Sequence, residues 1–434
     1  MEQPISKQEI GFSGSTKPRS RVRWWLALLF FVIGLIAYMD RSNIAVIAKP
    51  MMDDLNMTKV QFGLLASFFS LGYALSQIPA GMLAERFGAR KIVFFALIWW
   101  SVFTGLTAIV KSHGLLAAVR FLFGVGEGPM YPGNAVFNTY WFPKQEKGRA
   151  SSALLAGSYF GPVIAPVLTV AIFQQWGWEA VFYIFGILGL IVAFLWYLLG
   201  RNKPEDHPYI SKEETQYILE NRTVQEEKKE IAPWRFFLKN GRFWALGIQY
   251  FVVLYIVTFF LVWLPTYLQE ARDFSLSSMG FAASLPWLCI FVTVMTGGAI
   301  SDYLVKIGKS KLIARGALAI GGLIVFSISM YLAAYATTPW MNVLWLTISL
   351  GSLGFPVVTS WAAAVDLGNE FSGSVSGWMN LWGNIGAFLS PLLCGWLAQT
   401  VGWENTLIIS IMPILVAVVL WFAVKPDRPL TETR

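Results

Sequence analysis

The chain is poor in charged residues and nearly devoid of histidine and cysteine. Of its 434 residues, 13% are charged and 56% are hydrophobic, with two histidines and two cysteines. A typical soluble domain carries about twice that share of charge, so a soluble globular protein is excluded. Cys289 and Cys394 lie inside apolar runs, which predicts reduced packing residues rather than a disulfide framework. Two scattered histidines give no basis for a metal site, and no motif indicates a cofactor.

Apolar runs recur along the whole chain. Each has about 20 residues, enough to cross a hydrocarbon core of about 30 Å as a helix. They predict an all-α membrane protein with twelve transmembrane helices in two pseudo-symmetric six-helix halves. The expected spans are 24–46, 61–84, 91–110, 114–137, 150–172, 178–199, 243–265, 279–301, 312–334, 341–363, 373–397 and 403–424.

A charged segment separates the sixth span from the seventh. Ser211 followed by Glu214 fits a capping box, which predicts a short surface helix near 212–221. The mixed charges of 226–230 indicate a solvated linker. The expected organisation is an N-terminal tail at 1–23, a first half at 24–200, a linker at 201–242, a second half at 243–424 and a C-terminal tail at 425–434.

Basic residues alternate between the connections and predict the orientation. Lysine and arginine are enriched on the cytoplasmic side of membrane proteins. Here they gather in both tails and after the second, fourth and eighth spans, whereas the turns 173–177 and 335–340 have none. Both termini are therefore expected in the cytoplasm, in a multi-pass protein of the cell inner membrane. The first span lacks a cleavage site, so we expect it to be retained. The net charge of +8 follows from this asymmetry and does not indicate nucleic-acid binding.

Four charged residues lie inside predicted spans: Asp40, Arg41, Arg120 and Glu127. A charge at membrane depth costs at least about 2.5–3.5 kcal/mol, so it usually faces a cavity and has a function. The planar guanidinium of Arg41 suits a carboxylate. Glu127 lies seven residues after Arg120, which places both on one helix face. A glutamate held between burial and a nearby arginine can exchange protons near working pH.

The alternative is that these residues form structural ion pairs that lock helices together. Buried ion pairs stabilise poorly compared with apolar replacements, which favours a functional role for the two acids and for Arg41. For Arg120 both interpretations stay open, because its proposed role is itself to hold Glu127.

The two halves repeat a loop after their second span. Gly81 to Lys91 and Gly298 to Lys309 each place an acid four residues after a glycine, at Glu85 and Asp302. Repeats of this kind accompany alternating access around a midplane site. The first loop resembles the signature loop of the major facilitator superfamily, with Glu85 at the usual aspartate position.

Other motifs resemble the anion:cation symporter branch of that superfamily, which includes sialin-like and bacterial sugar-acid transporters. They are Tyr38–Ala45, Arg120–Glu127, Pro129–Pro132, Trp141–Pro143 and Phe259–Leu268. The resemblance covers nearly the whole chain. It implies a monomeric transporter in the lipid bilayer, not an enzyme, that works on protons and a small organic anion.

The resemblance implies a role for each charged residue. Asp40 and Glu127 would be the proton-coupling acids, Arg41 the contact for a substrate carboxylate, and Arg120 a modulator of the pKa of Glu127. Neutral hydroxyls, an amide and aromatic faces would complete a site for a polyhydroxylated acid. By resemblance the substrate-binding positions are Tyr38, Tyr73, Ser158, Ser360, Trp361 and Asn380. Related transporters carry glutamine where this chain has Ser158, so the particular acid stays open.

The signature loops are expected to govern conformation rather than recognition. By resemblance, Glu85 should meet the start of the eleventh span near 372–374, a contact that exists only while the cytoplasmic side is closed. The residues assigned to gating are Glu85, Arg86, Arg90 and Asp302.

Together these observations predict a proton symporter that imports a small organic anion such as an aldonate, aldarate or hexuronate. A facilitator or antiporter on the same fold is the nearest alternative, and the intramembrane acids argue against a pure uniporter. A membrane sensor is less favoured because the sequence contains no cytosolic output domain, and a membrane enzyme is favoured least.

Overall fold

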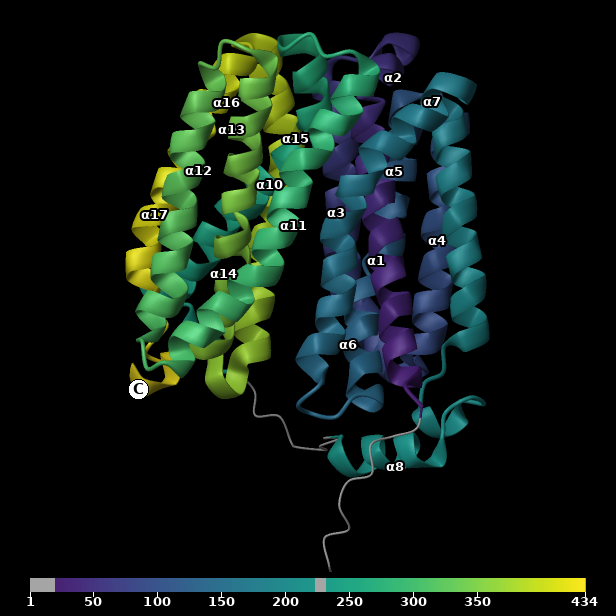
Figure 1. Cartoon of the computed structure of the whole chain (residues 1–434), viewed down its shortest axis with the longest axis vertical. Helices are drawn as coiled ribbons and strands as arrows, with labels where there is room; N and C mark the ends of the chain where they lie inside the picture. Colours follow the sequence, from purple (N-terminus) through teal and green to yellow (C-terminus); the bar gives the residue numbers. More distant parts are fainter. Residues whose placement is uncertain (1–19, 223–231, 434) are drawn as a thin grey trace, which may run out of the picture.

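The computed structural model describes residues 20–222 and 232–433, and these form two helical bundles side by side (Figure 1). The helices up to α7 form one bundle, and those from α10 to α17 form the other. Lys7, Lys17 and Arg19 of the predicted basic tail lie outside the described residues, and so does the predicted solvated segment 226–230.

The first bundle turns back on itself inside its longest helix. Gly177 interrupts α7 with a φ of 82°, a left-handed conformation that glycine adopts without steric cost. Trp141 Nε1 donates a hydrogen bond of 2.9 Å to the carbonyl of Arg201, so both ends of α7 lie on one side of the bundle. The helices are α1 (Val22–Val46), α2 (Ala48–Leu55), α3 (Lys59–Phe87), α4 (Ala89–Ile109), α5 (His113–Glu127), α6 (Met130–Trp141) and α7 (Lys147–Leu199).

The second bundle begins after the linker and the short helix α9 (Trp234–Phe237). Its helices are α10 (Gly241–Ala271), α11 (Leu276–Lys306), α12 (Leu318–Ala334), α13 (Pro339–Ser352), α14 (Gly354–Gly368), α15 (Ser372–Thr400), α16 (Trp403–Ile409) and α17 (Ile411–Val424).

The helices match the predicted spans and differ from them in where helices are merged or divided. The predicted span 341–363 is divided into α13 and α14, and the predicted span 403–424 into α16 and α17. Among the described residues, nine helical stretches are long and apolar enough to cross a membrane. Two of them hold two predicted spans each: α7, and the stretch Pro339–Thr400 that contains α13 to α15. The predicted span 114–137 is divided into α5 and α6 at Pro129, because proline lacks the N–H that continues a helix. The predicted all-α membrane fold is confirmed.

The predicted linker helix is present as α8 (Lys212–Asn221), and Ser211 is its N-cap. The Ser211 hydroxyl accepts a hydrogen bond of 3.2 Å from the backbone N–H of Glu214. The carboxylate of Glu214 does not return to Ser211 as in a full capping box. It turns to the start of α1, where Oε2 accepts hydrogen bonds from Val22 N at 3.0 Å and from the Ser20 hydroxyl at 2.5 Å.

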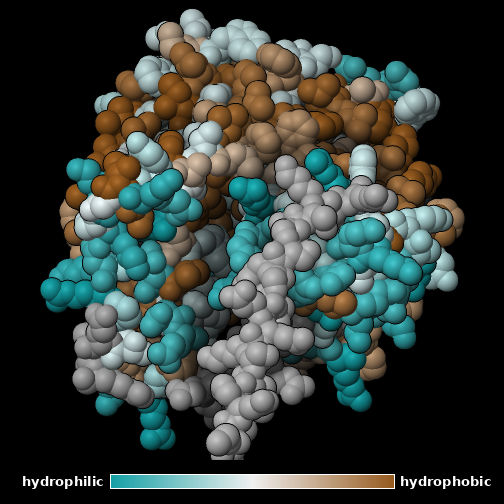
Figure 2. Space-filling model, turned by 60° about the horizontal axis from the view of Figure 1, so that its bottom comes forward, coloured by the Kyte–Doolittle hydropathy of each residue, from teal (hydrophilic) through white to brown (hydrophobic). Residues whose placement is uncertain are grey.

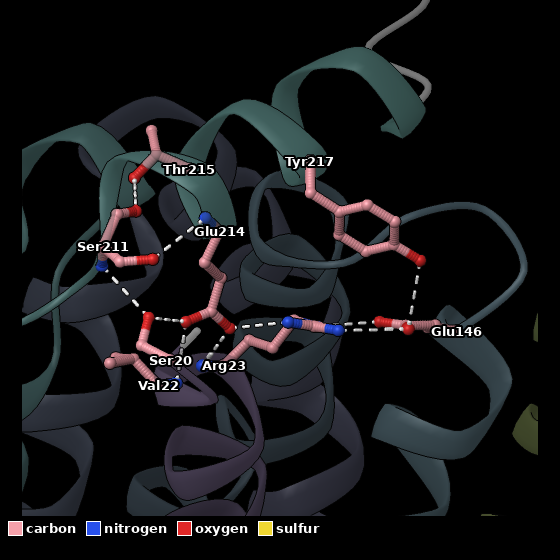
Figure 3. A network of polar contacts seen from close by, with 8 residues as sticks. All are labelled: Ser20, Val22, Arg23, Glu146, Ser211, Glu214, Thr215 and Tyr217. Atoms are coloured by element: carbon pink, nitrogen blue, oxygen red, sulfur yellow. Dashed lines mark hydrogen bonds and ion pairs between the residues drawn. The ribbon is translucent and has the colours of Figure 1, made fainter. Parts of the chain in front are cut away.

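A buried arginine continues this network into the first bundle (Figure 3). Arg23 donates from Nη1 to Glu214 Oε1 at 2.6 Å and from Nε to Glu146 Oε2 at 2.8 Å. The Tyr217 hydroxyl donates to Glu146 Oε1 at 3.4 Å. Helix α8 is therefore held against the start of α1 and the connection before α7.

Removal of the Glu214 carboxylate should destabilise the first bundle. Its side chain is fully buried, and loss of one partner of a buried ion pair costs up to about 3–5 kcal/mol. We expect Glu214→Ala to lower the apparent melting temperature in detergent. Glu220→Ala on the exposed face of α8 is the matched control and should change it little. Equal melting temperatures for wild type and Glu214→Ala would contradict this role.

Candidate functional site

A cavity of about 550 Å³ lies between the two bundles. Its wall comes from α1, α3, α5, α6 and α7 on one side and from α10, α11, α14 and α15 on the other. The volume is within the range of small-molecule binding sites. The wall is mostly apolar and aromatic, with a limited set of hydroxyl and amide groups, which suits an organic solute with several polar substituents.

Arg41 is bound to Glu127 at the wall of this cavity. Its Nε donates a hydrogen bond of 2.5 Å to Glu127 Oε2, and both side chains are buried. The guanidinium lies over the rings of Tyr38 and Tyr73, each at 4.4 Å to the ring centroid, and over Phe69 at 5.0 Å. Aromatic faces attract a desolvated cation, so these rings hold the arginine in place without neutralising it.

Asp40 lies next to this pair and is 1% exposed. Within the described part of the chain, neither of its carboxylate oxygens has a hydrogen-bond partner. It interacts electrostatically with Glu127 and Arg120. A buried carboxylate without a partner is costly unless it binds a proton or meets a cation, so Asp40 has the surroundings of a proton-exchanging group. Among residues 20–222 and 232–433, no cluster of His, Cys, Asp and Glu could hold a metal ion.

Arg120 lines the cavity but does not make the expected contact. The shared helix face predicted that Arg120 would hold Glu127, whereas the hydrogen bond to Glu127 comes from Arg41 on α1. Arg120 interacts with Glu127 and Asp40 electrostatically. Its guanidinium lies over Phe123 at 4.5 Å and Phe69 at 5.5 Å.

Two glycines set the position of the helix that carries Arg120 and Glu127. A Cβ on Gly124 of α5 would collide with the carbonyl oxygen of Phe69 on α3, and one on Gly72 would collide with the carbonyl oxygen of Phe121. The absence of side chains at these crossings lets the two backbones approach closely. This packing places the acid on α5 within reach of α1.

The predicted neutral residues divide into two groups. Tyr38, Tyr73, Trp361 and Asn380 line the cavity. Ser158 and Ser360 are buried behind its wall. The Ser158 hydroxyl accepts a hydrogen bond of 2.9 Å from the hydroxyl of Tyr131, which does line the cavity, and the Ser360 hydroxyl accepts one of 3.1 Å from Gln249 Nε2.

Residues 30–391 match the sequence profile of the Major Facilitator Superfamily. The chain belongs to this superfamily. It is 31% identical to the probable galactarate/D-glucarate transporter GudP of Escherichia coli (strain K12), over 97% of each chain. It is also 31% identical to an ascorbate transporter, chloroplastic, of Arabidopsis thaliana, over 92% of this chain and 78% of that one. The protein is therefore a transporter and not an enzyme.

A solved structure of the same superfamily fold agrees with the two-bundle arrangement. The crystal structure of a bacterial homolog to the human lysosomal transporter Spinster, inward-facing and unoccupied, superposes with a TM-score of 0.78. The match covers 94% of this chain and 98% of that one, at 17% identity. At this identity the likeness supports the fold alone.

The two bundles of this transporter meet at the end opposite α8. There Lys59 at the start of α3 pairs with Glu270 of α10 at 3.0 Å, and the rings of Phe62 and Trp263 are 5.6 Å apart. At the α8 end, the lining residues Ser151 and Ser152 are exposed. Figure 2 shows a hollow between polar surfaces at that end. The cavity is therefore closed away from α8 and reached from the α8 side.

The predicted gating residues lie at the end of the protein where α8 is. Glu85 and Arg86 are exposed, and among the described residues the carboxylate of Glu85 has no hydrogen bond or ion pair. The Arg90 side chain donates to the Tyr197 carbonyl at 2.9 Å, and Asp302 pairs with Arg315 at 2.8 Å. The predicted contact of Glu85 with residues 372–374 is not made in this structure, and it stays a prediction.

Several cavity residues were absent from the sequence prediction. Gln77, Asn134, Tyr250 and Asn384 line the cavity. Gln77 accepts a hydrogen bond of 3.0 Å from Asn380 Nδ2, which joins the two bundles across the cavity. Amide side chains inside apolar spans were the available signal, because an unpartnered amide in a membrane segment is costly.

Proposed function

We propose that this transporter is a proton-coupled symporter that imports a small organic anion, a sugar acid, by alternating access. The observation that carries the proposal is the 2.5 Å ion pair between Arg41 and Glu127 at the cavity wall. One guanidinium is bound by an acid and is also the best partner for a substrate carboxylate. The sugar-acid class is supported by the relatives named as galactarate/D-glucarate transporters.

Competition for Arg41 can couple the proton to the substrate. While Glu127 is ionised, its Oε2 occupies the Nε donor of Arg41. A proton on Glu127 removes its charge, and a charge-assisted hydrogen bond becomes a weaker neutral one. The guanidinium is then available to a carboxylate in the cavity. Asp40 is the second proton-coupling acid, because its buried carboxylate also interacts with Glu127.

The neutral cavity residues would recognise the rest of the molecule. The hydroxyls of Tyr38 and Tyr73 and the amide of Asn380 can hydrogen-bond to substrate hydroxyls, and Trp361 presents an aromatic face to sugar carbons. Ser158 and Ser360 act indirectly in this proposal. Ser158 orients the Tyr131 hydroxyl, and Ser360 holds Gln249.

Purified protein in liposomes tests the proposal. A panel of aldonates, aldarates and hexuronates is offered with an inward proton gradient, and accumulation of the labelled acid is measured. We expect accumulation of at least one acid above equilibrium, abolished by a protonophore. Equilibration without accumulation would identify a facilitator, and uptake driven by an outward gradient of a second anion would identify an antiporter.

We place the transporter as a monomer in the bilayer of the cell inner membrane, with the α8 end and both termini in the cytoplasm. The basic loops support this orientation. A reporter fused after residue 434 and one inserted in the linker at 220 should both show cytoplasmic activity. A periplasmic signal from either reporter would contradict this topology and the two-half organisation.

Glu85 should control the population of the two conformations. Its predicted partner is the start of α15, where free N–H groups and the helix dipole stabilise a carboxylate by about 0.3–1 kcal/mol, and by about 2 when partly buried. We expect Glu85→Gln to favour the state open on the α8 side and to slow turnover. Labelling of a cysteine at Ser151, in a background without Cys289 and Cys394, should then rise.

The matched control for this change is Glu220→Gln, an acid-to-amide substitution on the same side of the protein. It should leave the labelling of Ser151→Cys unchanged. Substrate affinity in Glu85→Gln should be preserved apart from the population shift. Altered selectivity together with unchanged labelling would remove Glu85 from the gate.

A further inference from the structure

Arg120 is one of two cations on the wall of the cavity. The residues that line it include Arg41 and Arg120 and, among the described residues, no aspartate, glutamate or lysine. The acids Asp40 and Glu127 lie behind this wall and are 1% and 0% exposed. An anion that enters the cavity therefore meets two guanidinium groups before it meets a carboxylate.

The guanidinium of Arg120 has donors to spare. The residue is 2% exposed, and within the described ranges its Nε and Nη1 have no hydrogen-bond partner. Glu127, on the same helix, accepts its hydrogen bond from Arg41 instead. A buried arginine offers five N–H donors, and leaving them unmade costs free energy. An electrostatic effect on Glu127 does not satisfy these donors, so Arg120 keeps hydrogen-bonding capacity beside the cavity that it lines.

The two arginines belong to one patch of positive charge. Both guanidiniums lie over Phe69, that of Arg41 at 5.0 Å and that of Arg120 at 5.5 Å from the ring centroid. Like charges this close repel one another, and both also interact with Glu127. The cluster is neutral when Asp40 and Glu127 are ionised. It carries two positive charges when both acids have bound a proton.

We infer that Arg120 is a second carboxylate contact, which makes the protonated site selective for a sugar acid with two carboxylates over one with a single carboxylate. The inference rests on the proposed function and assigns Arg120 a direct part in recognition. Arg41 binds one carboxylate, and Arg120, which also lines the cavity, binds the other through its guanidinium. Two protons on the acids and two negative charges on the substrate leave the loaded cluster neutral.

A matched pair of ligands tests the inference. Galactarate and D-galactonate have the same carbon chain and differ at one end, where a carboxylate replaces a hydroxymethyl group. Equilibrium binding of both is measured over a range of pH for wild type and for Arg120→Gln. We expect Arg120→Gln to weaken galactarate binding at least about tenfold, equivalent to about 1.4 kcal/mol, and to change galactonate binding less than about threefold.

If Arg120 acts only by changing the proton affinity of Glu127, the expected result is different. Both ligands would then weaken together, and the pH at which binding is half-maximal would shift by the same amount for each. That outcome overturns the inference, and so does unchanged binding of galactarate by Arg120→Gln. If wild type binds neither acid at any pH, the proposed substrate class fails and the inference falls with it.

Arg120→Lys is a second variant that separates a loss of binding from a loss of folding. Lysine keeps the charge and much of the apolar stem but has no fork of donors. We expect a monodisperse protein with galactonate binding like wild type and with galactarate binding between those of wild type and Arg120→Gln. Equal losses for both ligands in a folded Arg120→Lys would also overturn the inference.

Discussion

Glu127→Gln should abolish accumulation driven by a proton gradient while leaving substrate binding in place. Glutamine has nearly the shape of a protonated glutamate, so it can still accept the hydrogen bond from Arg41 Nε. It cannot ionise, so it neither reclaims the guanidinium nor carries a proton. The variant should therefore bind the acid, exchange it across the membrane in counterflow, and fail to concentrate it.

The measurement is uptake by liposomes with and without a pH gradient, beside counterflow in the same preparation. Asp40→Asn should also lose gradient-driven accumulation, because Asp40 is the second buried acid of the cluster. Glu220→Gln, on the exposed face of α8, is the control for an acid-to-amide change and should behave as wild type. Normal accumulation by both cavity variants would exclude these acids from the coupling.

The division of the chain into spans followed directly from its composition. A run of about 20 apolar residues has few alternatives to a membrane helix, since its backbone polar groups must be satisfied internally. Local breaks were harder to place. The interruption at Pro129 falls inside the predicted span 114–137 and leaves the hydropathy of that segment unchanged. The turn at Gly177, by contrast, falls in the predicted turn 173–177.

The members of the charged cluster were predictable, but their pairing was not. A charge inside an apolar span stands out in any sequence, which identified Asp40, Arg41, Arg120 and Glu127. Helical spacing then favoured Arg120 as the partner of Glu127. The observed partner, Arg41, is 86 residues away in sequence. Its approach depends on close packing of α5 on α3 at glycine crossings, which spacing within one helix does not report.

The linker illustrates the same limit outside the membrane. The pattern from Ser211 to Glu214 predicted the helix and its N-cap, because a capping bond is local. It also predicted a reciprocal bond from the glutamate. The carboxylate instead meets the start of α1, about 190 residues earlier, where backbone N–H groups and Arg23 offer a stronger site. Which of these two partners the Glu214 carboxylate takes depends on the tertiary structure, which the local pattern does not contain.

Arg41→Lys should weaken substrate binding at least about tenfold, although the charge is kept. Arginine presents a planar fork that can bind a carboxylate through two N–H groups, and lysine presents a compact point charge. Loss of one charge-assisted hydrogen bond costs about 1.5–3 kcal/mol, and 1.4 kcal/mol corresponds to a factor of ten in affinity. The rings of Tyr38 and Tyr73 add to the difference, because a flat guanidinium stacks on them better than an ammonium does.

Binding of the best substrate from the panel is measured at a pH low enough that the affinity of wild type no longer changes with pH. Proton binding then limits neither protein. Arg201→Lys is the control, since Arg201 donates to backbone carbonyls at the end of α7 and is not among the cavity-lining residues. It should retain wild-type affinity. Lysine can still pair with Glu127, so Arg41→Lys should fold with its ion pair conserved and lose mainly the bidentate contact. Unchanged affinity in a folded Arg41→Lys would place the substrate carboxylate elsewhere in the cavity.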